Sequence, residues 1–223
     1  DYNSGMLSRL RALSLPFGNA TAFWCAGAGL TLFWFGLKAP AKLREHEHAL
    51  SPAFRAHLLC SGVTSCVCMW NLCFSPSQGP LLAAIHKRLG RLGVATSLLG
   101  LSAGYVAAWT DEGVPRPTAA GLSAVGALQL YFTLAGVRHV RLAQHALGDE
   151  RKRHLEKHAQ AMNALFFGAC LGPAWFRLPG WAAEAMGQDP KALPEGVMFL
   201  GMIPAVLMPR AAYLALSRRR FFG

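Results

Sequence analysis

Three histidines lie where an apolar stretch of the chain meets basic residues: His86, His139 and His158. Each belongs to a different stretch, and consecutive membrane helices of alternating direction would bring all three to one depth. Two neutral imidazoles that face each other across a helix bundle commonly hold the iron of a b-type haem. We therefore consider haem ligation for this trio, with a structural or lipid-headgroup role and proton handling as the alternatives.

The residues from Ile85 to Trp109 form the stretch around which the chain is organised. A basic cluster opens it, and about 18 uncharged residues follow, roughly the length that crosses a hydrocarbon core. Gly93, Gly100 and Gly104 lie within it. The last two are four residues apart, a spacing that lets helix backbones approach closely in lipid. We therefore expect this helix to pack inside a bundle.

The composition also indicates a membrane protein. Of the 223 residues, 53% are hydrophobic and 15% are charged, whereas soluble domains have about 25% charged residues. The formal net charge is +11, but the basic residues alternate with apolar runs, which favours anionic lipid over nucleic acid as the partner. The six cysteines lie in or beside apolar stretches without metal-site spacing. We expect them to pack as small hydrophobic residues.

Six apolar stretches are long enough to cross a membrane, so the expected fold is an all-α, polytopic membrane helix bundle in a single domain, residues 1–223. The stretches lie at about 17–37, 54–74, 85–109, 118–136, 158–176 and 196–216. Residues 1–16 have the spacing of an interfacial helix. Small residues in the middle stretches predict a four-helix core over 54–180, with the last span, 196–216, at its periphery.

Three connecting segments complete the predicted layout. Residues 75–91 are expected to form a loop that begins with a turn and ends in the basic cluster. The highly charged residues 143–157 are expected to form a short helix outside the membrane, before a fifth span that starts at His158 and contains Pro173. Arg177 to Trp181 are expected to break that span at the membrane interface, where tryptophan is favoured.

Six spans place both termini on the same side of the membrane. That side carries fourteen Lys or Arg against four acidic residues, which the positive-inside rule assigns to the inside. Four arginines of this side are expected to contact lipid or partner subunits: Arg88, Arg91, Arg138 and Arg141. Arg210, within the last span, is expected to be paired or to extend its side chain to the inside interface.

Two motifs on the predicted inside face occur in a fixed order. The first is His86-Lys87-Arg88-Leu89-Gly90-Arg91, and the second is Gly148-Asp149 followed by His158-Ala159-Gln160-Ala161-Met162, with Arg177 and Pro179 beyond. They are similar to H-R-x-x-G-R and G-D…H-x-x-x-M. Over residues 54–180 the chain thus resembles a family of uncharacterised polytopic membrane proteins, best known from bacteria and defined as a domain of unknown function. The resemblance implies a membrane bundle and no particular activity.

Together these features predict a mainly structural subunit of a larger energy-transducing, respiratory-type membrane complex, with b-type haem as a candidate cofactor and bound phospholipid. The expected location is the mitochondrial inner membrane, with a plastid or bacterial inner membrane as alternatives. The alternative function is a stand-alone b-haem electron carrier or a quinone oxidoreductase that uses His86 and His158. A transporter is disfavoured because the spans contain almost no acidic residues.

Overall fold

Helices make up the regular secondary structure of the residues that the computed structural model describes, namely 29–30, 33–34, 36–37, 50–73, 76, 79–112, 114–166, 172–189 and 193. The complete helices are α3 (Pro52–Cys73), α4 (Pro80–Thr110), α5 (Arg116–His145), α6 (Gly148–Leu165) and α7 (Gly172–Ala185). The predicted all-α class is confirmed for this part of the chain. The segment 1–16, the span 196–216 and Arg210 lie outside the described residues.

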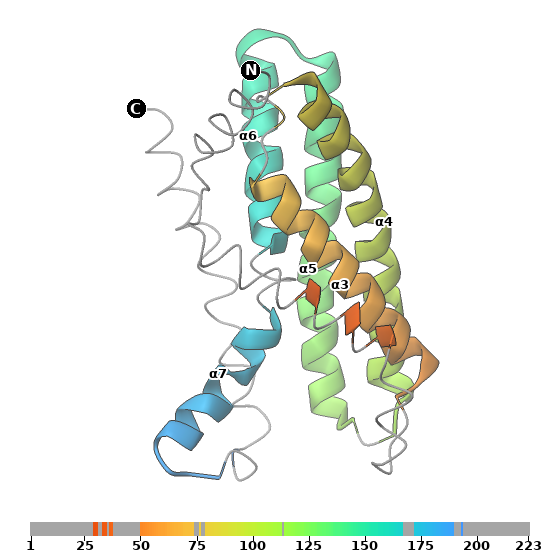
Figure 1. Cartoon of the computed structure of the whole chain (residues 1–223), viewed down its shortest axis with the longest axis vertical. Coiled ribbons are helices and arrows are strands. Elements are labelled where there is room, and N and C mark those ends of the chain that lie inside the picture. The colour runs from red at the N-terminus through yellow and green to blue at the C-terminus, as the bar shows by residue number, and fades with distance from the viewer. Residues whose placement is uncertain are drawn as a thin grey trace, which may run out of the picture.

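Four of these helices pack in chain order. The helices α4, α5 and α6 run side by side along the long axis, and α3 crosses them obliquely (Figure 1). The contacts join α3 to α4, α4 to α5, and α5 to α6. The helix α7 lies to one side of this group. Each neighbour in the sequence is thus a neighbour in space.

The packing of α3 on α4 depends on glycines of α4. A Cβ atom at Gly100 would lie 3.0 Å from the Cβ atom of Cys60. At Gly104 it would lie 2.6 Å from Nδ1 of His57, and Gly93 also faces α3. The close backbone approach predicted from the Gly100 and Gly104 spacing is confirmed.

Hydroxyl groups link α3, α4 and α5 near the middle of the bundle. The Oγ1 atoms of Thr64 and Thr96 are 2.8 Å apart, and Oγ of Ser97 lies 3.2 Å from Oγ1 of Thr133. Thr96 and Ser97 are adjacent in α4, so their side chains point to different neighbours. Such bonds between membrane helices contribute about 0.6 kcal/mol on average. They also satisfy polar groups that are buried among apolar side chains.

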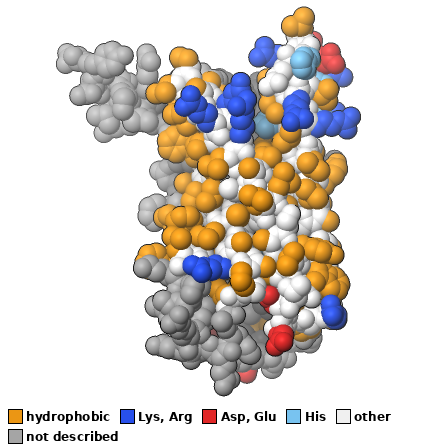
Figure 2. Space-filling model, turned by 90° about the vertical axis from the view of Figure 1, so that its right-hand side faces the viewer, with side chains coloured by type: hydrophobic (Ala, Val, Ile, Leu, Met, Phe, Trp, Pro, Cys, Tyr) orange, Lys and Arg blue, Asp and Glu red, His pale blue; other side chains and the backbone are white. Residues whose placement is uncertain are grey.

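Two of the described helices, α4 and α5, are long and apolar enough to cross a membrane, and most of each apolar window is not buried within the structure. Residues 92–110 and 117–137 contain no charged side chain and no histidine. At 1.5 Å per residue these segments measure about 28 and about 31 Å, close to a hydrocarbon core of about 30 Å. Figure 2 shows the corresponding band without charged side chains, with a strongly basic end on one side of it.

Three predicted boundaries are wrong. The helix α4 begins at Pro80, so the basic cluster predicted in the loop 75–91 is helical. The helix α5 continues past the predicted end at 136, to His145. Residues 148–165 form one helix, so no boundary separates an outer helix from a span at His158. Lys, Arg and Glu are good helix formers whose long side chains extend into water, so charge alone does not end a helix.

The predicted break at Arg177–Trp181 is also wrong. These residues lie inside α7, which contains Pro179. The described part of α6 ends at Leu165, and α7 begins at Gly172. Pro173 therefore stands in the first turn of α7, where a proline costs little because the first N–H groups of a helix have no partner within it.

The turn between α5 and α6 is short. Only Ala146 and Leu147 lie between the two helices. Gly148 has a φ of 54°, in the left-handed region that other residues adopt at a cost of about 1–2 kcal/mol. The Gly148 of the second motif thus has a local structural role: it reverses the chain so that α6 packs antiparallel to α5.

Candidate functional site

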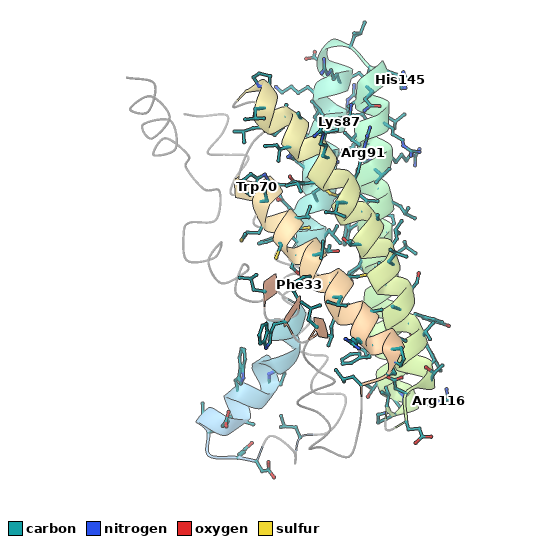
Figure 3. All side chains as sticks on the ribbon, turned by 45° about the vertical axis from the view of Figure 1, so that its right-hand side comes forward. Phe33, Trp70, Lys87, Arg91, Arg116 and His145 are labelled. Atoms are coloured by element: carbon teal, nitrogen blue, oxygen red, sulfur yellow. The ribbon has the colours of Figure 1, made fainter. Side chains whose placement is uncertain are left out.

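The three histidines singled out by the sequence lie on three consecutive helices. His86 is in α4, His139 in α5 and His158 in α6. His86 precedes Lys87, which lies toward the same end of the bundle as His145 (Figure 3). The described contacts of His139 and His158 run between α5 and α6, and they define the candidate site.

His158 contacts the backbone of α5. Its Nδ1 lies 2.9 Å from the carbonyl oxygen of Gly136. A carbonyl oxygen only accepts hydrogen bonds, so Nδ1 carries the proton and Nε2 of the neutral ring has the lone pair. Gly136 permits this approach, because a Cβ atom there would collide with the end of the Met162 side chain. The two named residues of the H-x-x-x-M motif therefore share the face of α6 that packs on Gly136.

The surroundings of His158 favour its neutral form. Burial lowers the pKa of His158, and the hydrogen bond to Gly136 opposes this effect only in part. The lowered pKa and the hydrogen bond from Nδ1 to Gly136 are both consistent with a neutral His158 that acts as a donor at pH 7.

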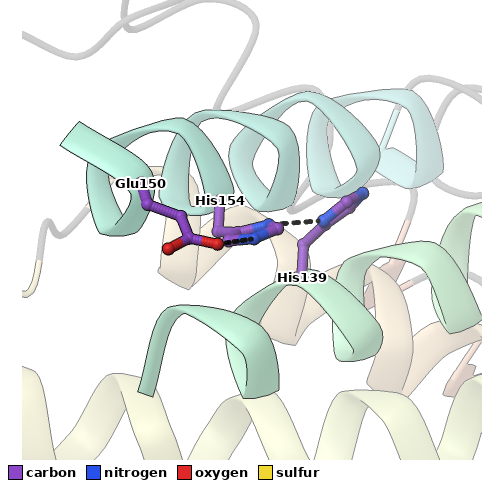
Figure 4. Close-up of polar contacts among 3 residues, drawn as sticks. All are labelled: His139, Glu150 and His154. Carbon is purple, nitrogen blue, oxygen red and sulfur yellow. Dashed lines mark hydrogen bonds and ion pairs between the residues drawn. The ribbon is translucent and has the colours of Figure 1, made fainter. Parts of the chain in front are cut away.

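His139 pairs with a histidine of the neighbouring helix (Figure 4). Its Nδ1 lies 3.2 Å from Nδ1 of His154, and the two rings stack with centroids 5.4 Å apart. One ring must donate its N–H while the other accepts, so the contact requires at least one neutral ring. On the far side of His154, Nε2 lies 3.9 Å from an exposed carboxylate oxygen of Glu150.

His154 was not among the residues predicted for the site. Residues 143–157 were predicted to form a segment separate from the helix of His158, so the regular spacing of His154 and His158 along one helix was not apparent. Glu150, His154 and His158 follow one another at intervals of four residues, so on a continuous helix they lie along one face. That periodicity was the signal available in the sequence.

The geometry limits which of these histidines fit a haem. With metal–nitrogen bonds of about 2.0 Å, two imidazole nitrogens on opposite faces of one iron are about 4 Å apart. The Nδ1 atoms of His139 and His154 are closer than this and contact each other directly, so these two atoms do not hold one iron between them. His158 does have the N–H to carbonyl bond that orients a metal-ligating histidine. In the described ranges, no group of three or more His, Cys, Asp or Glu residues is placed to hold a metal ion.

The four predicted contact arginines of the described residues gather at one end of the bundle. The bond between Ser97 and Thr133 aligns α4 and α5 in antiparallel register. Arg88 and Arg91 precede Ser97, and the two arginines of α5 follow Thr133, so all four project from the same end. Figure 2 shows this end as a cluster of Lys and Arg side chains, and in Figure 3 it carries Lys87, Arg91 and His145.

The opposite end has fewer free charges. Ser51 donates a hydrogen bond to Oδ2 of Asp111 at 2.9 Å. The guanidinium of Arg116 lies 5.5 Å from the centre of the Trp109 ring, where a cation is attracted by the π electrons. Trp109 in turn donates to Ser123, which joins α4 to α5. The charge asymmetry along the bundle is therefore large.

No family model, curated protein or solved structure matches this chain. The resemblance carried by the two histidine-containing motifs therefore stays a prediction. The site is interpreted from its own geometry: an interface between two helices held by imidazoles, next to a basic end.

Proposed function

We propose that this chain is an integral membrane protein and a mainly structural subunit of a larger energy-transducing complex. The observation that carries the proposal is the pairing of α4 and α5. Their uncharged segments are antiparallel and similar in length, they are mostly not buried within the chain itself, and they share one basic end.

Lipid explains the exposed apolar surface better than water does. Tyr105 of α4 and Tyr131 of α5 are 58% and 64% exposed, and Leu99 between the helix ends is 63% exposed. Exposed apolar side chains of this size are unusual as a continuous surface of a soluble monomer. Against lipid or a partner helix they need no aqueous contact.

A structural role accords with how the polar groups of the middle are used. Two pairs of hydroxyl groups form hydrogen bonds between helices: Thr64 with Thr96, and Ser97 with Thr133. These bonds fix the relative positions of α3, α4 and α5, and they add no group directed at a substrate. The polypeptide resembles a scaffold on which partner subunits and lipids assemble.

The basic end is proposed to face the inside of an organellar inner membrane, most simply the mitochondrial matrix. Basic residues near the ends of spans are retained on that side by the positive-inside rule. The full proposal has six spans with both termini inside. It includes a membership in the uncharacterised polytopic family, on the strength of the His86 and His158 motifs.

The test is purification of the tagged protein from its native membrane in mild detergent. The expected result is a particle much larger than the 24.0 kDa chain that contains the same additional subunits in every preparation. A lone 24 kDa protein without associated chains would contradict the subunit proposal. Recovery of the chain in the soluble fraction without detergent would contradict membrane insertion itself.

The alternative function is a stand-alone b-haem electron carrier or quinone oxidoreductase. The observation that favours it is the Gly136 carbonyl bond of His158, which leaves Nε2 of this ring as the candidate ligand atom. His86 is the proposed partner on α4. A bound haem would supply one-electron redox chemistry, and the residues of this chain would bind and orient it.

An absorption spectrum of the purified protein separates the two functions. The alternative requires a Soret band that shifts on reduction and is lost in His158→Ala but not in His145→Ala. A spectrum without such a band would refute the alternative and leave the structural subunit.

A further inference from the structure

The outward face of α5 carries a groove at the basic end. Six residues line it: Leu134, Val137, Arg138, Arg141, Leu142 and His145. Its volume is about 330 Å³. All six of these described residues belong to α5, and none of them takes part in the α5–α6 contacts described above.

The groove faces away from the neighbouring helices. Thr133 of α5 bonds to α4, while Gly136 and His139 contact α6. At 3.6 residues per turn, positions 134, 138, 141 and 145 fall on the opposite side of the helix. The groove therefore opens toward whatever surrounds the bundle.

Its lining changes from apolar to cationic along the helix. Leu134 and Val137 end the uncharged segment of α5, and Arg138 is the first charge beyond it. Arg141 follows three residues later, so the two guanidinium groups are neighbours on the helix surface. Toward the middle of the bundle, the exposed side chains of Leu130 and Tyr131 extend the apolar part.

Among the described residues, neither arginine forms an ion pair with an acidic side chain. A pair of guanidinium groups binds a phosphate through several charge-assisted hydrogen bonds. An apolar surface directly beside them suits an acyl chain. One molecule combines these two parts in the required order, namely a phospholipid.

We propose that this groove is a binding site for one anionic phospholipid. The phosphate lies against Arg138 and Arg141, His145 contacts the outer headgroup, and an acyl chain follows Leu134 and Val137 toward the middle of the bundle. The site rests on the proposed membrane insertion of α5. The groove would hold one lipid at a defined position, whereas the basic end as a whole would attract any anionic leaflet.

The experiment is native mass spectrometry of the full chain in mild detergent, delipidated and titrated with phosphatidylglycerol or phosphatidylcholine. Wild-type protein is expected to bind one phosphatidylglycerol well before it binds phosphatidylcholine. The double variant R138Q/R141Q is expected to bind phosphatidylglycerol about tenfold more weakly or worse, because it loses charge-assisted hydrogen bonds to the phosphate.

Two further variants separate the groove from its charge. R151Q/R153Q removes the same net charge from exposed positions of α6 and is expected to change the affinity less than about twofold, as screened surface charges do. Val137→Trp fills the groove, keeps the charge and is expected to weaken binding. Val137→Leu adds a smaller side chain to the groove. Its lipid affinity can be compared with that of the wild type if Val137→Trp does not fold. Each variant must keep the helical circular dichroism of the wild type.

Several outcomes would overturn the proposal. These are equal weakening by R151Q/R153Q, no effect of a folded Val137 variant, or equal affinity for phosphatidylcholine. Displacement of the lipid by millimolar inorganic phosphate would assign the site to a soluble anion. Loss of co-purifying subunits in R138Q/R141Q without a change in lipid affinity would assign it to a protein partner. If the groove does not bind lipid, the proposal of a membrane subunit still stands. If the chain is soluble in water, both proposals are refuted.

Discussion

Replacing Gly104 with alanine tests the packing of α4 on α3. The new Cβ atom would lie 2.6 Å from Nδ1, 3.0 Å from Cε1 and 3.2 Å from Cγ of the His57 ring. Nδ1 of this ring also donates a hydrogen bond to the carbonyl oxygen of Gly100, 2.8 Å away. A rigid imidazole held at its Nδ1 has to move as a unit to make room.

The expected sign follows from three opposing magnitudes. Overpacking a close contact costs about 1–3 kcal/mol, and a lost bond between membrane helices costs about 0.6 and at most about 1.7 kcal/mol. Alanine is favoured over glycine within a helix by about 1 kcal/mol. The steric and hydrogen-bond costs prevail, so Gly104→Ala is expected to destabilise the protein by about 1–3 kcal/mol.

The assay is reversible unfolding in mixed micelles with increasing dodecyl sulfate, followed by far-ultraviolet circular dichroism. The matched control is Gly126→Ala in α5, where the nearest atom to a new Cβ is Cδ2 of Leu101 at 3.7 Å, an ordinary contact. There the helix propensity of alanine is unopposed, and we expect a gain of about 0.5–1 kcal/mol.

A double-mutant cycle identifies the cause. In a His57→Ala background the obstructing ring is gone, so Gly104→Ala is expected to cost little or to stabilise. Equal destabilisation by Gly104→Ala with and without His57 would refute the steric reasoning. So would a stabilised Gly104→Ala single variant, or a Gly126→Ala variant that is destabilised as much.

Three further predictions use the same assay. Gly148→Ala should cost about 1–2 kcal/mol through the left-handed backbone alone, since nothing lies within 4 Å of a new Cβ; unchanged stability would contradict this. Thr133→Val should cost about 0.6–1.7 kcal/mol and show coupling to Ser97→Ala; additive effects would exclude their bond. Because burial lowers the pKa of His158, the unfolded chain binds more protons, and stability should fall as the pH drops below about 6.5. His158→Gln, whose amide can still donate to Gly136, should reduce that fall, and an unchanged pH slope would refute it.

Local sequence pattern predicted the helices better than their ends. The uncharged run after Arg91 predicted α4, and its glycine spacing predicted a closely packed face, which in the structure lies against α3. The ends were misplaced at 91, 136 and 158 because the change from apolar to charged residues was taken as a helix end. That change reflects the surroundings of a helix, while the backbone hydrogen bonds continue through residues of high helix propensity.

The candidate site was predicted only in part. His86, His139 and His158 were predicted to lie at one depth, but the imidazole that contacts His139 belongs to His154. The outward groove at Arg138 and Arg141 depends on side-chain directions and on which described helices pack against α5, and neither property is local. Whether these arginines contact lipid was a prediction from charge and stays one.

Residue types and spacing were enough to predict an all-helical chain with apolar stretches of membrane-spanning length and basic residues gathered at one end. These properties depend on residue type and spacing along a single helix, where period and length suffice. Three features depend on how the helices pack: His158 donates to the carbonyl oxygen of Gly136, His139 contacts His154, and the 134–145 face of α5 is uncovered by the other described helices. Those contacts depend on the rotation and crossing of each helix relative to the next, which side-chain packing between helices sets.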